Sequence, residues 1–292
     1  MKRKKVLAGV LGALCAVMAL AFALYPLISN YFASRNKSLV CTEYSDTIEE
    51  FDRSELDEMR QAARAYNARL APVSVAVEES FSQAGLLAAA EDYDELLAVN
   101  ASGMMGYIEI PKIGVYLPIY HGTSEAVLQA GVGHLLGSSL PVGGEGSHTV
   151  LTAHSGLARE TMFSDLDQLT PGDIFYLHIL DETLSYEVTE LFTVLPEDAS
   201  RLTVCKGEDL CTLVTCTPFG VNTHRLLVRG SRTEYSPDIV NADAEEATTE
   251  SAPSTWAQEY CKGLALTLAL FAIGGTSVFL CRRRKRGKHE SS

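Results

Sequence analysis

The chain has 292 residues, of which 47% are hydrophobic and 21% charged, and its formal net charge at pH 7 is −13. This length is sufficient for a substantial hydrophobic core. Ten of the 24 basic residues lie in the terminal tails, 1–5 and 282–292, with only one of the 37 acidic residues, so the segment between the tails is strongly acidic. Such a segment argues against nucleic-acid binding and against adsorption to an anionic membrane surface.

Two uncharged apolar runs lie near the ends of the chain, at residues 6–28 and 263–281. Each is long enough to cross a bilayer as a helix, which takes about 20 residues. Basic clusters precede the first run and follow the second, and such clusters stay on the cytoplasmic side. The sequence therefore predicts a protein held in the cell membrane by two spans, with residues 29–262 extracytoplasmic. A cleaved signal peptide is the alternative for the first run, because Ala21–Ala23 resembles a cleavage site.

The stretch after the first run predicts a helical region. Residues 29–45 show little pattern, whereas from Asp46 onward apolar residues recur at helical spacing. Ser54 is the expected N-cap of this helix, and Pro72 is expected to end it. One or two further short helices are predicted over residues 80–100.

The pattern then changes to short strands separated by Gly and Pro. Residues 173–180 and 184–195 predict a hairpin around the turn at 181–182, and short helices fit residues 125–130 and 163–169. About eight strands with few long helices indicate a closed β-barrel or a sandwich.

Two of the seven cysteines, Cys205 and Cys211, flank a predicted turn, and residues 201–205 before it have a strand pattern. This arrangement gives the hypothesis that the two thiols face each other across a hairpin and form a disulfide, which an extracytoplasmic compartment permits. The sequence has no paired Cys-x-x-Cys motif, Gly-rich phosphate loop or His-Glu-x-x-His motif. No metal and no organic cofactor are therefore predicted.

The stretch Thr212–Gly230 carries the strongest functional signal. Strand-forming residues end before Pro218 and resume after a loop, so that Cys216 ends one strand and Arg225 begins the next. A guanidinium close to a thiol favours the thiolate, and it also favours an oxyanion over a carbonyl. A buried structural Cys with an unrelated surface Arg is the alternative interpretation.

Acyl transfer by a thiol also needs a group that manages protons, and seven histidines are available. His154 ends a predicted strand immediately before a Ser-Gly turn, a place from which a side chain can reach a cleft. His178 has no turn beside it. His224 adjoins Arg225, but neighbours on a strand point to opposite faces.

The segment Thr212-Leu213-Val214-Thr215-Cys216, followed nine residues later by Arg225, resembles the signature of the sortases, and its continuation resembles their class C, pilus-assembling branch. The resemblance covers roughly residues 104–233. It implies an eight-stranded β-barrel with Cys216 as the nucleophile. It also implies that His154 is the catalytic histidine and that Arg225 steadies the substrate carbonyl or oxyanion.

The activity implied by this resemblance is that of a membrane-anchored cysteine transpeptidase. Its Cys216 thiolate would attack the Thr–Gly bond of a sorting signal similar to Leu-Pro-x-Thr-Gly, and a lysine of the next pilin subunit would resolve the thioester. The implied partners are pilins or surface proteins that carry such signals. Two alternatives remain: an enzyme that attaches proteins to peptidoglycan or acts mainly as a cysteine peptidase, and a non-catalytic membrane-tethered scaffold.

Class C sortases carry a lid in which an Asp-Pro-aromatic tripeptide covers the cysteine. In this chain the only proline between residues 38 and 100 is Pro72, which follows Ala71, so the tripeptide is absent. Whether other residues, such as those around Phe81, cover the site is left open by the sequence.

The predicted fold class is mainly β: a closed eight-stranded sortase-type barrel with short helices, preceded by a helical region and flanked by two transmembrane helices. The predicted organisation is a cytoplasmic tail (1–5), an anchor or signal peptide (6–28), a helical N-terminal or lid region (29–101), a catalytic barrel (102–235), an acidic linker (236–262), a second span (263–281) and a basic cytoplasmic tail (282–292).

Overall fold

The computed structural model describes residues 2–74, 92–100, 103–155 and 162–235, and a few positions between 260 and 267. The chain forms two compact units, residues 25–252 being one and residues 1–24 with 253–292 the other. The predicted acidic linker and second span lie almost wholly outside the described residues, as does the 80–91 part of the short helices predicted over residues 80–100.

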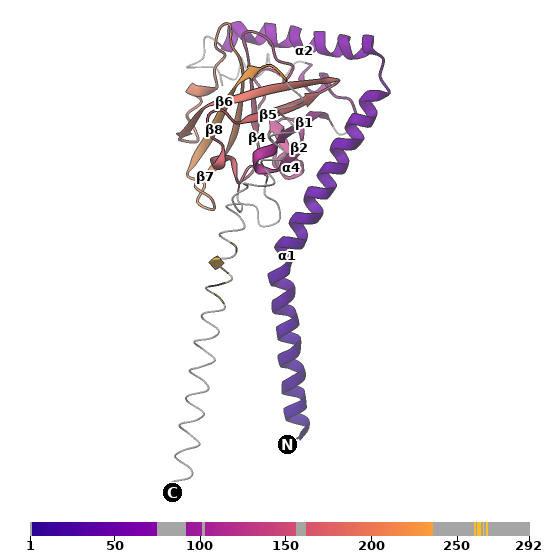
Figure 1. The fold of residues 1–292 in the computed structure, drawn as a ribbon, viewed down its shortest axis with the longest axis vertical. Coiled ribbons are helices and arrows are strands. Elements are labelled where there is room, and N and C mark those ends of the chain that lie inside the picture. Colours follow the sequence, from indigo (N-terminus) through magenta and orange to yellow (C-terminus); the bar gives the residue numbers. More distant parts are fainter. Residues whose placement is uncertain are drawn as a thin grey trace. The chain divides into compact units, whose positions relative to one another are not determined.

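A closed barrel of eight strands forms the centre of the larger unit (Figure 1). The strand order around the barrel is β1-β2-β3-β4-β7-β8-β6-β5. Neighbouring strands are antiparallel except for the pairs β2–β3 and β4–β7, which are parallel. This confirms the predicted closed barrel. The strands are β1 (Met104–Ile110), β2 (Val115–His121), β3 (Val132–His134), β4 (Ser147–Thr152), β5 (Ile174–Ile179), β6 (Glu182–Val194), β7 (Asp209–Thr217) and β8 (His224–Thr233).

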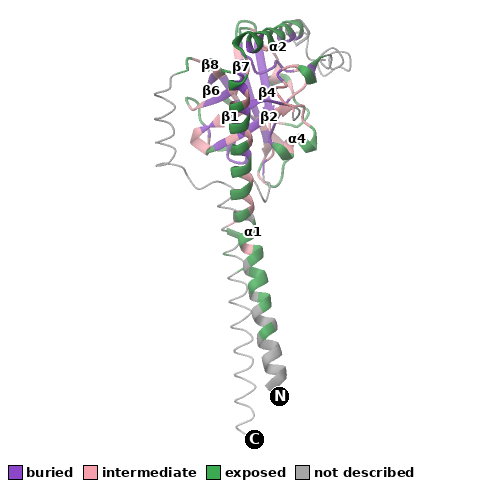
Figure 2. Cartoon of the chain, turned by 90° about the vertical axis from the view of Figure 1, so that its right-hand side faces the viewer, coloured by how far each residue is buried: buried purple, intermediate pink, exposed green. Residues whose placement is uncertain are grey.

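Alternation along each strand separates the barrel interior from its outer face. In β7, Cys211 and Leu213 belong to the hydrophobic core, as does Val228 in β8 and Leu151 in β4. The residues between them therefore point outward. Figure 2 shows the strands largely buried, since loops and helices cover much of the outer face.

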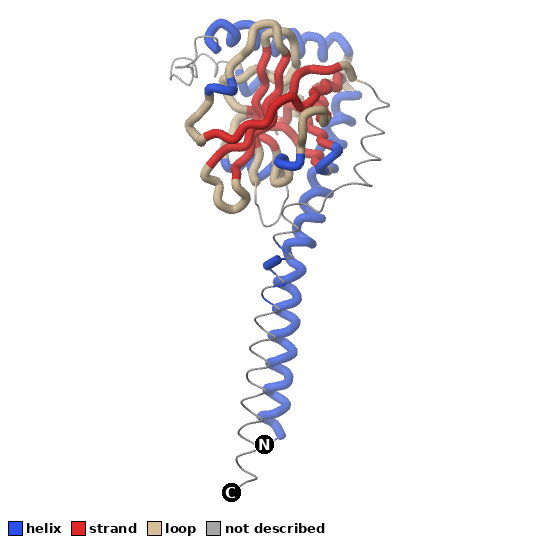
Figure 3. The backbone as a smooth tube through the Cα atoms, turned by 60° about the vertical axis from the view of Figure 1, so that its left-hand side comes forward, coloured by secondary structure: helices blue, strands red, loops and turns tan. Residues whose placement is uncertain are grey.

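Short helices connect the strands, and two long helices precede them (Figure 3). The hairpin β5–β6 and the helix α4 occur where the sequence predicts them. The predicted strand over residues 201–205 is wrong, because its first half is a 3-10 turn. The helices are α1 (Lys2–Glu49), α2 (Arg53–Ser74) and α4 (Glu125–Ala130), and the 3-10 turns are η1 (Tyr93–Glu95), η2 (Pro111–Ile113), η3 (Leu166–Gln168) and η4 (Ser200–Leu202).

The helix α1 is longer than the apolar run that it contains, and residues 29–45, which lack a clear sequence pattern, continue it. Within the part of the chain that the structure describes, one helical segment, Val17–Glu49, is long and apolar enough to cross a membrane. The next helix, α2, begins one residue after Asp52, whose backbone N–H donates to Glu55 at 3.0 Å. Asp52 therefore takes the capping place that the sequence assigned to Ser54.

The helix α2 lies across one end of the barrel (Figure 1). Polar side chains attach it there. Arg60 is buried and forms ion pairs with Asp181 and Glu182 at the β5–β6 turn. The side-chain amide of Asn67 bonds both backbone groups of Leu140, donating to the carbonyl at 3.0 Å and accepting from the N–H at 2.7 Å. The N-terminal helices of the larger unit are therefore part of the same folded body as the barrel.

Tyr44 attaches the last part of α1 to the barrel in the same manner. Its buried hydroxyl donates to the carbonyl of Met105 at 2.9 Å and accepts from the N–H of Leu180 at 2.9 Å. Tyr44→Phe leaves both backbone groups without this partner, so we expect a loss of about 2 kcal/mol in the free energy of unfolding. Urea unfolding of the full chain in detergent measures this loss. Tyr31→Phe, at an exposed position of α1, is the matched control and is expected to change little; equal losses in the two variants would contradict the assignment.

Candidate active site

Adjacent strands bring the three predicted site residues together. Cys216, near the end of β7, is the register partner of Arg225 in β8. On the other side of β7, Thr152 of β4 is aligned with Val214 in a parallel pair. Two residues further along both strands, this register brings His154 beside Cys216. The order across the sheet is His154, Cys216, Arg225.

The alignment of β4 with β7 continues beyond the last residue of β4. The N–H of Ala153 donates to the carbonyl of Val214 at 3.2 Å, and the hydroxyl of Thr215 donates to the carbonyl of Ala153 at 2.9 Å. Because Thr215 is buried and Cys216 follows it, Cys216 points to the outer face. Thr215 therefore fixes the backbone of Ala153, the residue before His154.

The loop between β7 and β8 holds the guanidinium of Arg225. Its Nη1 donates to the carbonyls of His224 at 3.1 Å and Asn222 at 3.4 Å. The chain reverses there through two residues with positive φ, Gly220 at 73° and Asn222 at 61°, a region that glycine and asparagine tolerate best. Cys216 and Arg225 are both only partly buried, so both are accessible to a substrate.

His154 contacts a carboxylate from outside the sheet. Its Nε2 lies 3.6 Å from Oε1 of Glu125, the first residue of α4. Its backbone carbonyl accepts from the N–H of Phe163 at 3.1 Å. Glu125 could not be identified from the sequence, because nothing in its neighbourhood links α4 to the end of β4.

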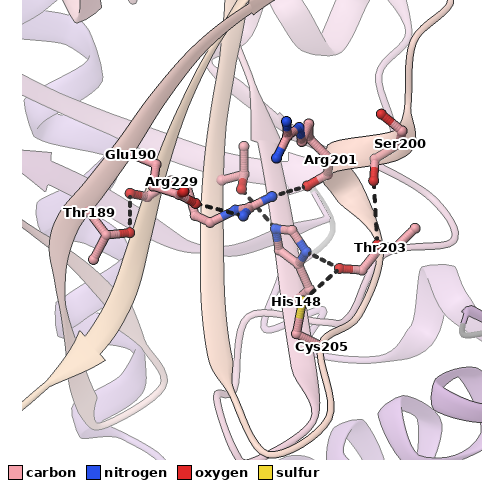
Figure 4. A network of polar contacts seen from close by, with 9 residues as sticks. His148, Thr189, Glu190, Ser200, Arg201, Thr203, Cys205 and Arg229 are labelled. Carbon is pink, nitrogen blue, oxygen red and sulfur yellow. Dashed lines mark hydrogen bonds and ion pairs between the residues drawn. The ribbon is translucent and has the colours of Figure 1, made fainter.

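A polar network on the same outer face anchors the connection between β6 and β7 (Figure 4). His148 of β4 donates from Nδ1 to the carbonyl of Thr203 at 2.8 Å and accepts at Nε2 from the hydroxyl of Thr212 at 2.7 Å. Arg229 of β8 bonds the carboxylate of Glu190 at 2.9 Å and the carbonyl of Arg201. Arg229 lies four residues along β8 from Arg225, so this network covers a neighbouring part of the same outer face. It was not predicted from the sequence.

The two cysteines of the predicted disulfide lie on opposite sides of the barrel wall. Cys205 belongs to the connection over the outer face (Figure 4), whereas Cys211 is fully buried and belongs to the core. Both are free thiols. The disulfide hypothesis is therefore wrong, because residues 201–205 are not a strand paired with β7.

His134 of β3 is buried like His148. Its Nδ1 accepts a hydrogen bond from the Tyr93 hydroxyl at 2.8 Å, and its Nε2 donates to the carbonyl of Ser139 at 2.8 Å. Burial lowers the pKa of each histidine from 6.5 to about 4. Both are therefore neutral in the folded protein near pH 7.

These depressed pKa values make the stability depend on pH. Below pH 6.5 the unfolded chain binds protons that the folded chain binds only near pH 4. The contribution is therefore fully present above about pH 6.5 and is lost as the pH falls towards 4, with about 2 kcal/mol per histidine lost by pH 5. Urea unfolding at about pH 6.5 and at about pH 5 measures this loss of stability. The variant His148→Gln is expected to lose about 2 kcal/mol less than wild type between these two pH values. An unchanged acid loss in that variant would contradict the assignment.

The other histidines considered for the site lie elsewhere. His178 of β5 stacks on Tyr107 with ring centroids 4.4 Å apart, and its Nε2 lies 3.1 Å from Glu109. His224 is the register partner of Thr217, one place beyond the Cys216 pair. Among the described residues there is no group of three or more His, Cys, Asp or Glu side chains arranged to hold a metal ion.

Comparison with known proteins places this barrel in a family. The model of the sortase domain matches residues 108–233. The chain is 34% identical over 130 residues to Sortase D of Bacillus subtilis, which covers 44% of the chain and 63% of that relative. Over 133 residues it is 30% identical to Sortase A of Bacillus anthracis, covering 46% of the chain and 61% of that relative. The chain thus spans somewhat less than two thirds of these curated relatives.

Solved structures match over a longer stretch. Sortase C1 of Streptococcus agalactiae is 42% identical, with a TM-score of 0.59, and the match covers 68% of this chain and 99% of that one. The chain belongs to the sortase family. Sortase C of Streptococcus pneumoniae is 44% identical with a TM-score of 0.59, over 68% of this sortase and 98% of that chain. Sortase C of Clostridium perfringens, solved with the C-terminal cell wall sorting motif, is 40% identical with a TM-score of 0.59, over 68% and 100% of the two chains. The structural neighbours of this sortase are thus pilin-type, class C enzymes.

Proposed function

We propose that this sortase is a cysteine transpeptidase that polymerises pilin subunits. The observation that supports this most directly is the register that aligns His154, Cys216 and Arg225 on one face of three neighbouring strands. Nucleophilic acyl transfer needs a thiolate, a proton donor and acceptor, and an electropositive group for the oxyanion, and these three side chains supply them.

In this proposal the Cys216 thiolate attacks the Thr–Gly carbonyl of a Leu-Pro-x-Thr-Gly-like sorting signal. The Arg225 guanidinium stabilises the oxyanion, and the His154 imidazolium gives its proton to the departing glycine amine. A thioester between Cys216 and the threonine acyl group results. A lysine amine of the next pilin, deprotonated by the now neutral His154, attacks the thioester and releases the thiolate with a new amide bond.

The proposed enzyme works at the outer side of the cell membrane. The apolar segment of α1 supports membrane anchoring. We extend this to two spans, residues 6–28 and 263–281, with a helical region (29–101), the catalytic barrel (102–235) and an acidic linker (236–262) between them on the extracytoplasmic side. This topology rests on the basic clusters beyond each run.

The test uses the full chain in detergent with a panel of sorting peptides and a pilin that carries both a sorting signal and an acceptor lysine. Mass spectrometry is expected to find a thioester adduct on the peptide that contains Cys216, and covalent pilin dimers to follow. An adduct without dimers would favour attachment to peptidoglycan or hydrolysis instead. The absence of both products would leave the non-catalytic scaffold as the better reading.

A further inference from the structure

The helix α4 lies beside the end of β4 because a glycine permits it. Gly133 of β3 is the register partner of Thr152, two residues before His154. A Cβ at Gly133 would lie 2.4 Å from the carbonyl oxygen of Gly122, and 3.1 Å and 3.3 Å from the side chains of Leu128 and Val127. Any other residue would therefore push α4 away from the strand. With glycine there, the first turn of α4 reaches His154.

Glu125, at the first position of α4, is held towards His154 from both ends of its side chain. Ser124 caps the helix by accepting from the N–H of Val127, which fixes the backbone of Glu125. At the other end, its Oε1 accepts from Nε2 of Gln129 at 3.0 Å. The same oxygen lies 3.6 Å from Nε2 of His154.

The imidazole of His154 has a polar atom in need of a partner. Its Nε2 is buried and has no hydrogen-bond partner among the described residues, although the side chain as a whole is 23% exposed. A buried donor without a partner is costly, and more so when it is charged. The Glu125 carboxylate at 3.6 Å is too far for a hydrogen bond to the neutral ring yet close enough to form an ion pair with the imidazolium.

We propose that Glu125 is a positioning residue that orients His154 and stabilises its imidazolium form. This inference rests on the proposed function. Binding Nε2 to Glu125 leaves Nδ1 as the ring nitrogen available for proton transfer. The charged groups aligned on the sheet side of His154 are the Cys216 thiolate, which also favours the imidazolium, and Arg225 on the next strand, which opposes it. Glu125 therefore adds a negative charge from the helix side and keeps the acid ready for the departing amine.

The test compares the pH dependence of kcat/KM for sorting-peptide cleavage in wild type and Glu125→Gln, with the full chain in detergent. Without the carboxylate the imidazolium has no ion-pair partner on the helix side, so the loss of activity is expected mainly on the alkaline limb of the profile. Because the Glu125 side chain is 70% exposed, we expect a modest effect: a loss of about two- to fivefold that grows as the pH rises. Glu125→Asp, which keeps a carboxylate, is expected to recover part of the activity.

Glu145→Gln removes one negative charge at an exposed position in the loop before β4 and is the matched control. If both variants gave the same profile, the pair with His154 would be refuted. A loss that is equal at every pH and accompanied by a lower Tm would also refute it, since it would indicate that Glu125 merely stabilises the first turn of α4.

NMR of the His154 ring separates failure of this inference from failure of the proposed function, because it needs no substrate. The Nε2–H proton is expected to exchange with solvent faster in Glu125→Gln than in wild type. An unchanged exchange rate would overturn the inference even in an active enzyme. Faster exchange in the variant of a chain that forms no thioester would instead count against the proposed transpeptidase.

Discussion

Replacing Cys216 with alanine is expected to abolish the thioester adduct and to lower sorting-peptide cleavage by at least about a thousandfold. The thiolate is the only group in the proposed mechanism that forms a covalent bond to the substrate. What remains in the variant is binding and oxyanion stabilisation by Arg225, which without the nucleophile supply only a small part of the wild-type rate enhancement. Mass spectrometry of the adduct and peptide cleavage assays measure the two effects.

Cys205→Ala is the matched control for this experiment. Like Cys216, Cys205 is a partly buried free thiol attached to the outer face of the barrel, but it lies in the connection that His148 and Arg229 anchor (Figure 4). It is expected to leave adduct formation intact. An adduct that persists in Cys216→Ala and disappears in Cys205→Ala would identify Cys205 as the nucleophile and contradict the proposed site.

Local patterns were sufficient to predict the strands and the neighbouring positions of Cys216 and Arg225. They left a barrel or a sandwich open, and the family resemblance indicated the barrel. Alternating apolar residues define strands, and a loop of a few residues brings the end of one strand next to the start of the following one. His154 was harder, since it lies some 60 residues earlier in the chain. Its place beside Cys216 depends on the parallel pairing of β4 with β7, and only the family resemblance indicated it.

Contacts between distant segments were the main features that the sequence did not reveal. His148 and Arg229 point outward from the barrel, yet the connection between β6 and β7 covers His148 completely. Periodicity identifies the inner face of a strand but not what covers its outer face. The same limit produced the wrong disulfide, because alternation alone did not show that Cys211 faces the core while Cys205 lies outside it.

The long α1 illustrates a second limit. Residues 29–45 are polar and irregular in pattern, but they contain no proline or glycine and they follow directly on an apolar helix. A helix that has been nucleated extends readily into such a segment. The buried side chains of Cys41 and Tyr44 then attach its last turns to the barrel. Propensity alone gave no reason to expect that attachment.

Replacing Arg225 with alanine is expected to lower kcat/KM for sorting-peptide cleavage by about 100- to 1000-fold, with little change in Tm. The guanidinium is held by two backbone carbonyls of its own loop and is paired in register with Cys216. It is thus oriented before the substrate arrives. Because the oxyanion forms only as the reaction proceeds, the loss should appear in kcat at least as strongly as in KM.

Arg225→Lys distinguishes an oriented guanidinium from a mere positive charge. Lysine keeps the charge but has no planar fork to bond the loop carbonyls and the oxyanion together, so we expect it to recover less than a tenth of the lost activity. Arg232→Ala, at the exposed far end of β8, removes a positive charge from the same strand and is expected to retain wild-type activity. If Arg225→Lys were fully active, general electrostatic attraction would suffice. If Arg232→Ala were as impaired as Arg225→Ala, the effect would belong to the net charge of the strand, and the register pair of Cys216 and Arg225 would lose its proposed role.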